Sequence, residues 1–372
     1  MRIAHVNMGH PRNPVFFGGA EVRNYEIYRR LSERGHQVTV VSSRVPGTED
    51  YRVNARFEYH FVGSNCEERT ASKIKSSLHF SAAAAAWLLR RAACYDVIVE
   101  ELSYWSPTLT PLLRGRPLVL QIQNVTPWAE MRVKSGLFVG AACYLSMRGY
   151  PRLFRRWIVL GEPLNARYGV RGEVIGQGID EELLAAHPRE GDYLGFLGRL
   201  DATQKGLDVL LDALARLRRR GRRLRLKLAG RGPDEGALRA RIRTLGLGGE
   251  VELLGWLEGE EKRRFLEGAR IVALPSRFEG QGIAAIEAAA CHKPLVVSAI
   301  PELRYCVEHG FGVAFAPFAP EALAVAIDRL WDDADRRAAL GRAGRAFAEG
   351  STWTQVADKF ERYLLAACAA GR

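Results

Sequence analysis

With 372 residues, of which 47% are hydrophobic, the chain is long enough for two domains with large cores. No apolar run reaches ~18 residues, so no membrane-spanning helix is expected. Its net charge of +12 is concentrated in residues 1–180, where 24 Lys and Arg face 15 Asp and Glu, so this half is expected to meet an anionic partner unless arginine is simply enriched throughout. The basic run at 216–225 lacks the interleaved aromatic residues of a nucleic-acid module, and the six scattered cysteines lack metal-ligand spacing, so neither nucleic acid nor metal is expected.

The first half of the chain alternates short apolar runs with helix-forming segments. We expect strands at residues 2–8, 37–43, 57–62, 96–100, 117–123 and 156–160. Because the first strand begins at the N-terminus, where a signal peptide would need a longer apolar region, we expect a cytoplasmic protein. A glycine-rich loop opens a helix that ends near Arg34, and 82–91 is a second helix former. This alternation predicts a parallel, doubly wound sheet.

The apolar run at residues 137–147 has two interpretations. It is followed by Arg148, Arg152, Arg155 and Arg156. As an amphipathic helix with a basic end it would rest on the inner face of the cell membrane and receive a lipid-linked acceptor. As a buried helix of the first domain it would have nearly the same sequence, so the residues alone leave both open.

A second series of strands and helices begins near residue 193. Strands are expected at 193–198, 225–229, 250–254, 271–275 and 294–298, and helices at 206–219, 259–267 and 282–291, with three more in the tail at 320–333, 334–349 and 353–368. The chain therefore contains two Rossmann-like units joined around 172–180. We expect a cleft between them, with the ligand at the carboxyl ends of the second unit's strands.

The segment from Arg277 to Glu287 is the most informative in the chain. An apolar strand leads into a turn flanked by Gly280 and Gly282, and an alanine-rich helix follows. This order directs free backbone N–H groups and a helix N-terminus at one point, which favours phosphate. Glu279 and Glu287 at the two ends would repel phosphate, so we expect them to bind hydroxyl groups on either side of it. A nucleotide-sugar has this arrangement of hydroxyls, diphosphate and hydroxyls.

Spacing separates this interpretation from that of a glycoside hydrolase. In those enzymes the paired carboxyl groups lie roughly 5–9.5 Å apart across one bond. If most of the eight steps from Glu279 to Glu287 are helical, the rise reaches about 12 Å, which suits the ends of an extended ligand. The plain alternative is that both are surface carboxylates of a helix.

Five segments, taken in chain order, resemble the motifs of one family. They are Gly18-Gly19-Ala20-Glu21 with Leu31 to Val38, Val174 to Asp180, Phe196 to Leu200 with Lys205-Gly206, Ala229 to Pro233, and Glu279 with Glu287. Each is weak alone, but all in register resemble the retaining, nucleotide-sugar-dependent glycosyltransferases of family 4, group 1. The resemblance covers nearly the whole chain. It implies an α/β GT-B fold with two Rossmann-like domains whose parallel sheets face an interdomain cleft: 1–172 on the acceptor side, 173–352 for the nucleotide-sugar, and a helix at 353–372 that packs back on the first domain.

The resemblance also implies a role for particular residues. Arg199 and Lys205 would bind the diphosphate and, with Glu279 on the donor sugar's hydroxyls, form the catalytic set. Glu287 would bind the ribose hydroxyls. The remaining donor-binding residues implied are Gly18, Gly19, Gln123, Arg231, Trp256, Leu257, Gly280, Gln281, Gly282 and Ile283. The nucleoside-diphosphate sugar is then a co-substrate, and no cofactor or metal is expected. Trp256 has core packing as its alternative.

Two positions depart from the family's pattern. Gln123 stands where a histidine is common, and Tyr305 where a carboxylate is common. These departures keep a second hypothesis open, a catalytically weak, binding-only partner of an active transferase. A phosphorylase or hydrolase on the same scaffold is disfavoured by the short chain. The acceptor is not identified: an anionic or lipid-linked molecule, a surface polysaccharide, a glycolipid and a secondary metabolite all fit.

Overall fold

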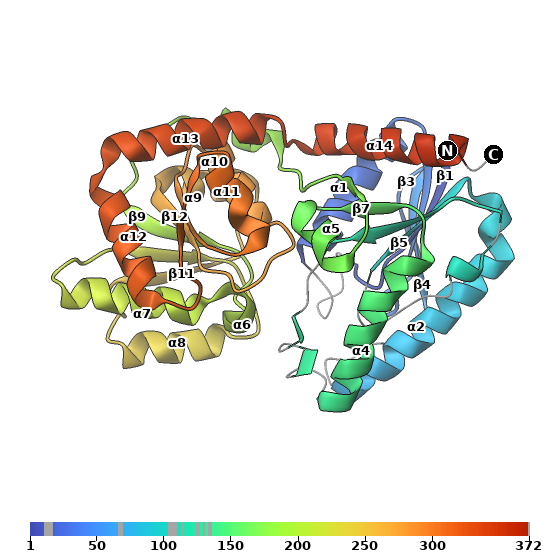
Figure 1. Ribbon diagram of the computed structural model, residues 1–372, viewed down its shortest axis with the longest axis horizontal. Helices are drawn as coiled ribbons and strands as arrows, with labels where there is room; N and C mark the ends of the chain where they lie inside the picture. Colours follow the sequence, from blue (N-terminus) through green and yellow to red (C-terminus); the bar gives the residue numbers. More distant parts are fainter. Residues whose placement is uncertain are drawn as a thin grey trace. The chain divides into compact units, whose positions relative to one another are not determined.

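The computed structural model of the chain describes residues 1–10, 18–65, 70–102, 110–113, 115–123, 127–128, 131–132 and 136–370. Two compact units are present: Met1–Gln177 together with Trp353–Arg372, and Gly178–Thr352. Figure 1 shows a sheet flanked by helices in each unit. No helix in the described part of the chain is both long enough and apolar enough to span a membrane.

The first unit is built on an eight-stranded sheet in the order β3-β4-β2-β1-β5-β6-β7-β8. Its strands are β1 Arg2–Val6, β2 Gln37–Ser43, β3 Tyr51–Asn54, β4 Phe57–Val62, β5 Val97–Glu101, β6 Leu118–Ile122, β7 Trp157–Val159 and β8 Glu173–Val174. Its helices include α1 Gly19–Glu33, α2 Thr70–Arg91, α4 Leu137–Gly149, α5 Glu162–Tyr168 and α14 Trp353–Ala369. All pairs are parallel except β3 with β4, which is antiparallel.

The C-terminal helix α14 returns to the first unit and lies along α1 (Figure 1). Phe360 of α14 is buried, and its ring meets that of Tyr28 on α1 edge-on at 5.8 Å between centroids. The guanidinium of Arg23, also on α1, lies over the same ring at 5.8 Å. These contacts confirm the predicted return of the last helix to the first domain.

The second unit has a six-stranded, all-parallel sheet in the order β11-β10-β9-β12-β13-β14. Its strands are β9 Tyr193–Leu197, β10 Leu226–Ala229, β11 Val251–Gly255, β12 Ala269–Leu274, β13 Leu295–Ser298 and β14 Gly312–Phe315. Its helices are α6 Ala202–Lys205, α7 Leu207–Arg219, α8 Glu235–Thr244, α9 Gly259–Gly268, α10 Ile283–Ala290, α11 Arg304–Glu308, α12 Pro320–Asp332 and α13 Ala334–Glu349. The predicted GT-B arrangement of two parallel-sheet α/β domains is confirmed.

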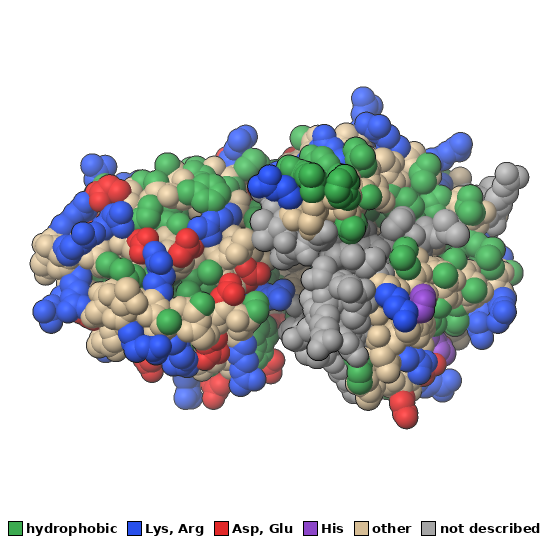
Figure 2. All heavy atoms as spheres, turned by 90° about the horizontal axis from the view of Figure 1, so that it is seen from below, with side chains coloured by type: hydrophobic (Ala, Val, Ile, Leu, Met, Phe, Trp, Pro, Cys, Tyr) green, Lys and Arg blue, Asp and Glu red, His purple; other side chains and the backbone are tan. Residues whose placement is uncertain are grey.

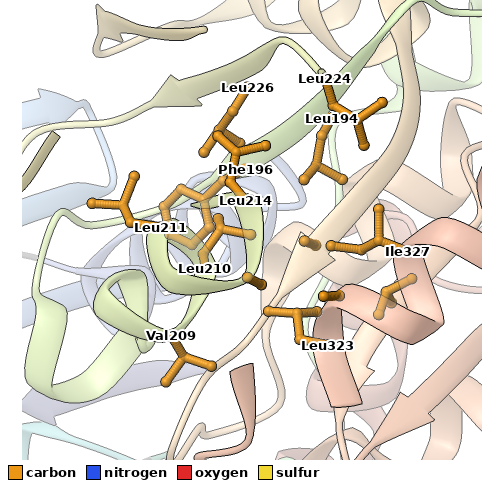
Figure 3. Packing of buried hydrophobic residues seen from close by; sticks show 14 of the residues in the cluster. Leu194, Phe196, Val209, Leu210, Leu211, Leu214, Leu224, Leu226, Leu323 and Ile327 are labelled. Carbon is orange, nitrogen blue, oxygen red and sulfur yellow. The ribbon is translucent and has the colours of Figure 1, made fainter. Parts of the chain in front are cut away.

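Alternate residues of the central strands of this sheet enter different cores. Leu194 and Phe196 of β9 pack with α7, α8 and α12, as Figure 3 shows for the labelled leucines around Phe196. Tyr193 and Leu197 of the same strand pack with α9 and α10. A strand covered on both faces has no polar side, which is why these segments read as continuous apolar runs.

Several elements differ from the sequence prediction. Helix α2 begins at Thr70, well before the expected segment 82–91. Apolar and polar residues are only weakly segregated on its faces, so the sequence does not mark where the helix starts. The short elements β3, β8, α5, α11 and β14 were not predicted. Residues 137–147 form most of α4. Gly140 and Met147 are buried and the other residues of this helix are not, so the interpretation as a buried helix is wrong. Cys94, Cys143, Cys291, Cys306 and Cys368 are free thiols, and Cys66 lies outside the described residues.

Candidate functional site

The loops that follow β9, β10, β11 and β12 all leave the same edge of the second unit's sheet, because these strands are parallel. They hold most of the residues that the sequence singles out: Arg199 and Lys205 after β9, Arg231 after β10, Trp256 and Leu257 after β11, and Glu279 to Gly282 after β12, where Ile283 begins α10. The fold therefore gathers these residues from 199 to 287 at one edge.

Lys205 and Glu279 contact each other directly. The Lys205 ammonium lies 2.5 Å from Glu279 Oε1, and the Ser276 hydroxyl donates to the same oxygen at 2.7 Å. Glu279 is buried, with 6% of its surface exposed, whereas the Lys205 side chain is 17% exposed. A buried carboxylate needs such partners to remain charged, so the pair holds a cation and an anion side by side at the sheet edge.

Arg277 joins the loop after β12 to the loop after β9. Its guanidinium donates to the Ala202 carbonyl at 2.5 Å and pairs with Asp208 at 2.6 Å, while its backbone N–H donates to the Gln204 carbonyl at 2.8 Å. Gly206, which lies between Gln204 and Asp208 in the sequence, adopts the left-handed conformation at φ +62°. A Cβ there would come within 2.1 Å of the Pro275 carbonyl oxygen. The position of Lys205 is thus set by the backbone of the neighbouring loop.

Arg199 and Arg231 are carried by two loops in close contact. The Leu200 N–H donates to the Arg231 carbonyl at 2.9 Å. A Cβ on Gly230 would lie 1.8 Å from the Gly198 carbonyl oxygen, so only glycine permits this approach. Both arginine side chains are exposed, and neither forms an ion pair or hydrogen bond with another side chain in the described ranges. Two cations are therefore available at this edge.

The turn before α10 ends in the left-handed region at Gly282, with φ +76°. The residue gives α10 no side-chain cap, so the first N–H groups of the helix are open to a ligand. The Tyr305 hydroxyl donates to the Gln281 carbonyl at 3.0 Å, which holds the turn from the other side. The helix begins only at Ile283, so the condition that most steps from Glu279 to Glu287 are helical is not met, and the helical rise to Glu287 is about 6 Å instead of about 12 Å.

Glu287 has a partner that the sequence analysis missed. The Lys262 ammonium of α9 lies 2.7 Å from Glu287 Oε1 and 3.5 Å from Asp180 Oδ2. Glu287 is 7% exposed, and its charge raises the pKa of Lys262 above the usual range. No sequence signal marks this pair, because Lys262 belongs to a run of charged residues typical of a solvated helix face.

Trp256 is not a core residue. Its surface is 43% exposed, and its indole N–H donates to Glu258 Oε1 at 2.6 Å. Leu257 is half-buried and packs against the core that α9 and α10 share. A separate Asp-x-Asp sequence caps a helix instead of joining the site: Asp333 accepts from the Arg336 N–H at 2.9 Å at the start of α13.

In the first unit, Gly18 and Gly19 precede and begin α1. Gly18 is extended at φ −175°, and a Cβ there would come no closer than 3.7 Å to a described neighbour outside the adjacent residues. A Cβ on Gly19 would first meet Gln177 Nε2 at 4.0 Å. Gln123 follows β6 and is 1% exposed; its amide nitrogen donates to Asn24 Oδ1 at 3.0 Å and Glu101 Oε2 at 3.1 Å.

Two family models match the chain in succession. The model described as Glycosyltransferase Family 4 matches residues 17–183, and that described as Glycosyl transferases group 1 matches residues 183–347. The alpha-D-kanosaminyltransferase of Streptomyces kanamyceticus is 33% identical over 38% of this chain and 37% of its own length. The D-inositol 3-phosphate glycosyltransferase 1 of Catenulispora acidiphila is 27% identical over 95% and 92%. Six further relatives, 30–35% identical, are matched over 39–50% of their own length.

Solved structures share the whole fold at low identity. The sucrose-phosphate synthase of Thermosynechococcus elongatus superposes with a TM-score of 0.83 at 19% identity, covering 99% of both chains. WaaG, a glycosyltransferase involved in lipopolysaccharide biosynthesis, gives 0.73 at 18% identity over 96% and 98%. Anabaena HepE in complex with UDP and glucose gives 0.70 at 19% identity over 98% and 100%. Two family models in succession on one chain with this fold show that the chain belongs to the family 4, group 1 glycosyltransferases of GT-B fold.

Proposed function

We propose that this protein transfers a sugar from a nucleoside-diphosphate donor to an acceptor hydroxyl, with retention of configuration. The observation that carries the proposal is the Lys205–Glu279 contact beside two exposed arginines and an uncapped helix N-terminus. This edge combines cations for a diphosphate with a buried carboxylate for sugar hydroxyls. The bond from the anomeric carbon to the diphosphate breaks, the acceptor oxygen bonds to the same face, and the acceptor proton passes to the departing diphosphate.

In this proposal Arg199 and Lys205 stabilise the negative charge that develops on the leaving diphosphate. Each charge-assisted hydrogen bond contributes roughly 1.5–3 kcal/mol. Glu279 accepts from hydroxyls of the donor sugar, and its bond to Lys205 holds the ammonium next to this carboxylate. Arg231 adds a third cation, and its separation from other charged side chains in the described residues leaves it free to contact the ligand.

The two ends of the donor are assigned to neighbouring loops. Backbone N–H groups of Gly280, Gln281, Gly282 and Ile283 would donate to the sugar or terminal phosphate. Glu287, oriented by Lys262, would accept from the ribose hydroxyls, and Trp256 with Leu257 would contact the base. Gly18 and Gly19, which have no side chain, would let the first loop approach the phosphates.

A thermal-shift panel tests the donor site. Purified protein is heated with UDP, GDP, ADP, dTDP and their common sugars, UDP first because the Anabaena HepE structures contain UDP and UDP-glucose. We expect one nucleotide to raise the melting temperature, and Arg199→Ala and Glu279→Ala to reduce the shift given by its sugar. The matched control is Arg239→Ala, which removes an exposed arginine paired with Glu235 on α8. No shift with any nucleotide, or an equal loss in the control, contradicts the donor site.

The second candidate function is a binding-only partner of an active transferase. Gln123 cannot titrate where a histidine is common, and the Tyr305 hydroxyl is already bonded to the Gln281 carbonyl. Release of free nucleotide from the donor that the panel selects, measured with and without acceptor extracts, separates the two. Nucleotide release above the rate of Glu279→Ala supports the enzyme, and binding without release supports the partner.

For the acceptor, we propose a lipid-linked or anionic molecule at an anionic membrane surface. Helix α4 and the turn after it expose Leu137 by 57%, Phe138 by 87%, Leu145 by 69% and Leu153 by 63%. The exposed side chains of Arg148, Arg152 and Arg155 adjoin them in the sequence. Figure 2 shows hydrophobic and basic side chains exposed on one face of the first unit. Apolar anchors with a basic margin favour a bilayer that carries negative headgroups.

Vesicle sedimentation tests this surface. We expect binding to phosphatidylglycerol vesicles, weaker binding to phosphatidylcholine, and loss when Phe138 and Leu145 are both changed to serine. Leu365→Ser, which alters a 47% exposed leucine on α14, is the control and should bind normally. Equal sedimentation of all three proteins, or none with the anionic vesicles, refutes the membrane contact.

A further inference from the structure

The non-glycine residues with a positive φ in the described part of the chain are Phe318, at +60°, and His292, at +57°. A side chain as large as that of phenylalanine costs free energy in this left-handed region, which glycine adopts freely. Burial of the ring does not offset this cost, because Phe318 is 63% exposed. A bulky residue that is both strained and exposed calls for a contact of its side chain that explains it.

The ring of Phe318 lies against the guanidinium of Arg277, with 5.1 Å between the ring centroid and Arg277 Cζ. The two residues come from different loops, since Phe318 stands between β14 and α12 while Arg277 follows β12. The face of an aromatic ring attracts a cation, so the ring limits where the guanidinium moves. Phe318 therefore covers part of the Arg277 side chain, which is 20% exposed.

Arg277 in turn holds the four-residue helix α6, which ends at Lys205. Its guanidinium donates to the carbonyls of Ala202 at 2.5 Å and Thr203 at 3.3 Å, and its backbone N–H donates to that of Gln204 at 2.8 Å. The last carbonyls of a helix lack partners within it, and a single turn is not stable by itself. Three successive carbonyls before Lys205 thus share one donor residue.

The amino end of α6 is held separately, by two carboxylates. Asp201 Oδ1 accepts from the Gln204 N–H at 2.9 Å, and Asp234 Oδ2 accepts from the Ala202 N–H at 2.7 Å. Anions at the amino end and a cation at the carboxyl end match the direction of the helix dipole. Because the amino end does not depend on Phe318, loss of the ring is expected to loosen the carboxyl end of α6 without unfolding the turn.

We propose that Arg277 and Phe318 are positioning residues for the transfer reaction: the ring holds the guanidinium against α6, and the guanidinium holds the turn from which Lys205 reaches the diphosphate. The inference rests on the proposed function, since it concerns the ligand assigned to Lys205. Glu279 contacts the Lys205 ammonium at 2.5 Å, and Arg277, from the same loop, holds the backbone that carries it. An ammonium fixed in this way loses less conformational entropy when phosphate binds. The strained conformation of Phe318 is thus retained for ligand binding instead of for stability.

Calorimetric titration of the full chain with UDP, or with the nucleoside diphosphate that the thermal-shift panel selects, measures this contribution. We expect Phe318→Gly and Phe318→Ala to weaken binding equally, by about three- to fivefold, because both remove the ring. Phe318→Tyr keeps the ring and should bind like the wild type.

Urea unfolding of the same variants separates positioning from a structural role. Phe318→Gly relieves the strain and should unfold at the same urea concentration as the wild type or a higher one. Phe318→Ala retains the strain and should unfold at a lower one. If the ring were only structural, affinity would follow stability, and Phe318→Gly would bind like the wild type.

His292→Gly is the matched control, because it relieves the same backbone conformation before the beginning of β13, at the sheet edge opposite to α6. It should not unfold at a lower urea concentration and should bind the nucleotide like the wild type. On the ligand side, UMP lacks the terminal phosphate and should bind the wild type and Phe318→Gly equally. Undiminished UDP affinity in Phe318→Gly, or an equal loss for UMP, overturns the inference while the donor site stands. Failure of the wild type to bind any nucleotide overturns both.

Discussion

The Lys262–Glu287 pair gives the most quantitative prediction. Changing Lys262 to methionine keeps most of the side-chain volume and leaves Glu287, which is 7% exposed, without its cation. Removing one partner of a buried ion pair costs about 3–5 kcal/mol, because the other charge stays desolvated. The Lys262 side chain is 15% exposed, so water can reach this site and reduce the free-energy cost. We expect about 3 kcal/mol for Lys262→Met.

Differential scanning calorimetry of the full chain measures this loss. For a unit of this size, 1 kcal/mol corresponds to roughly 2–4 °C, so the second unit's transition should fall by about 6–12 °C. Adding Glu287→Gln removes the stranded charge and should restore at least about half of the loss. Arg239→Met, which breaks the exposed pair with Glu235, should cost less than about 1 kcal/mol.

The outcome that refutes this reasoning is specific. If Lys262→Met melts within about 2 °C of the wild type, Glu287 is not held by Lys262 in solution. If the two substitutions are additive, the residues do not interact, since a contacting pair gives a coupling energy in a double-mutant cycle.

Three further predictions concern the fold around the sites. In urea unfolding, Gly230→Ala should destabilise the second unit by about 3 kcal/mol or more, because φ is +145° and a Cβ would lie 1.8 Å from the Gly198 oxygen. The control Gly236→Ala on α8, with open space around it, should be neutral or slightly stabilising. Phe360→Ala should cost the first unit about 3–5 kcal/mol by calorimetry, whereas Leu365→Ala on the exposed side of α14 should cost under about 1. The pKa of His5 in the folded protein is below its ordinary 6.5, so the unfolded chain binds more protons between these two values and the free energy of unfolding decreases as pH falls below 6.5. His5→Gln should reduce this dependence of stability on pH. Urea titrations at several pH values measure it, and an unchanged dependence contradicts the prediction.

Much of the fold could be predicted from the sequence, for a reason visible in the second sheet. Strands such as β9 and β12 bury both faces, so every residue from Tyr193 to Leu197 is apolar or glycine and the segment stands out against the charged helices. Short edge elements carry no such signal. Strand β3 is partly exposed and pairs antiparallel at the end of its sheet, and its sequence resembles a loop.

The partners of the candidate site residues could not be predicted in the same way. Lys262 and Glu287 are 25 residues apart and meet only because α9 and α10 pack on one face of the sheet. Nothing in the run from Glu260 to Arg264 distinguishes Lys262, whose side chain is 15% exposed, from the other four charged residues. The sequence therefore predicted a carboxylate and a loop, while the cation that orients the carboxylate depended on tertiary packing.

The network around Gln123 shows why a departure from a family pattern is informative only with its surroundings. Taken alone, glutamine at a histidine position suggests lost function, since an amide cannot exchange protons. Asn24 and Glu101 accept from both N–H groups of this amide, and its oxygen is buried with no hydrogen-bond partner among the residues that the structure describes. A residue that had merely decayed would have no reason to be held in one orientation at such a cost by two others. Because the amide of Gln123 is held in one orientation, the loss of a titratable histidine at this position is not by itself evidence of a decayed site.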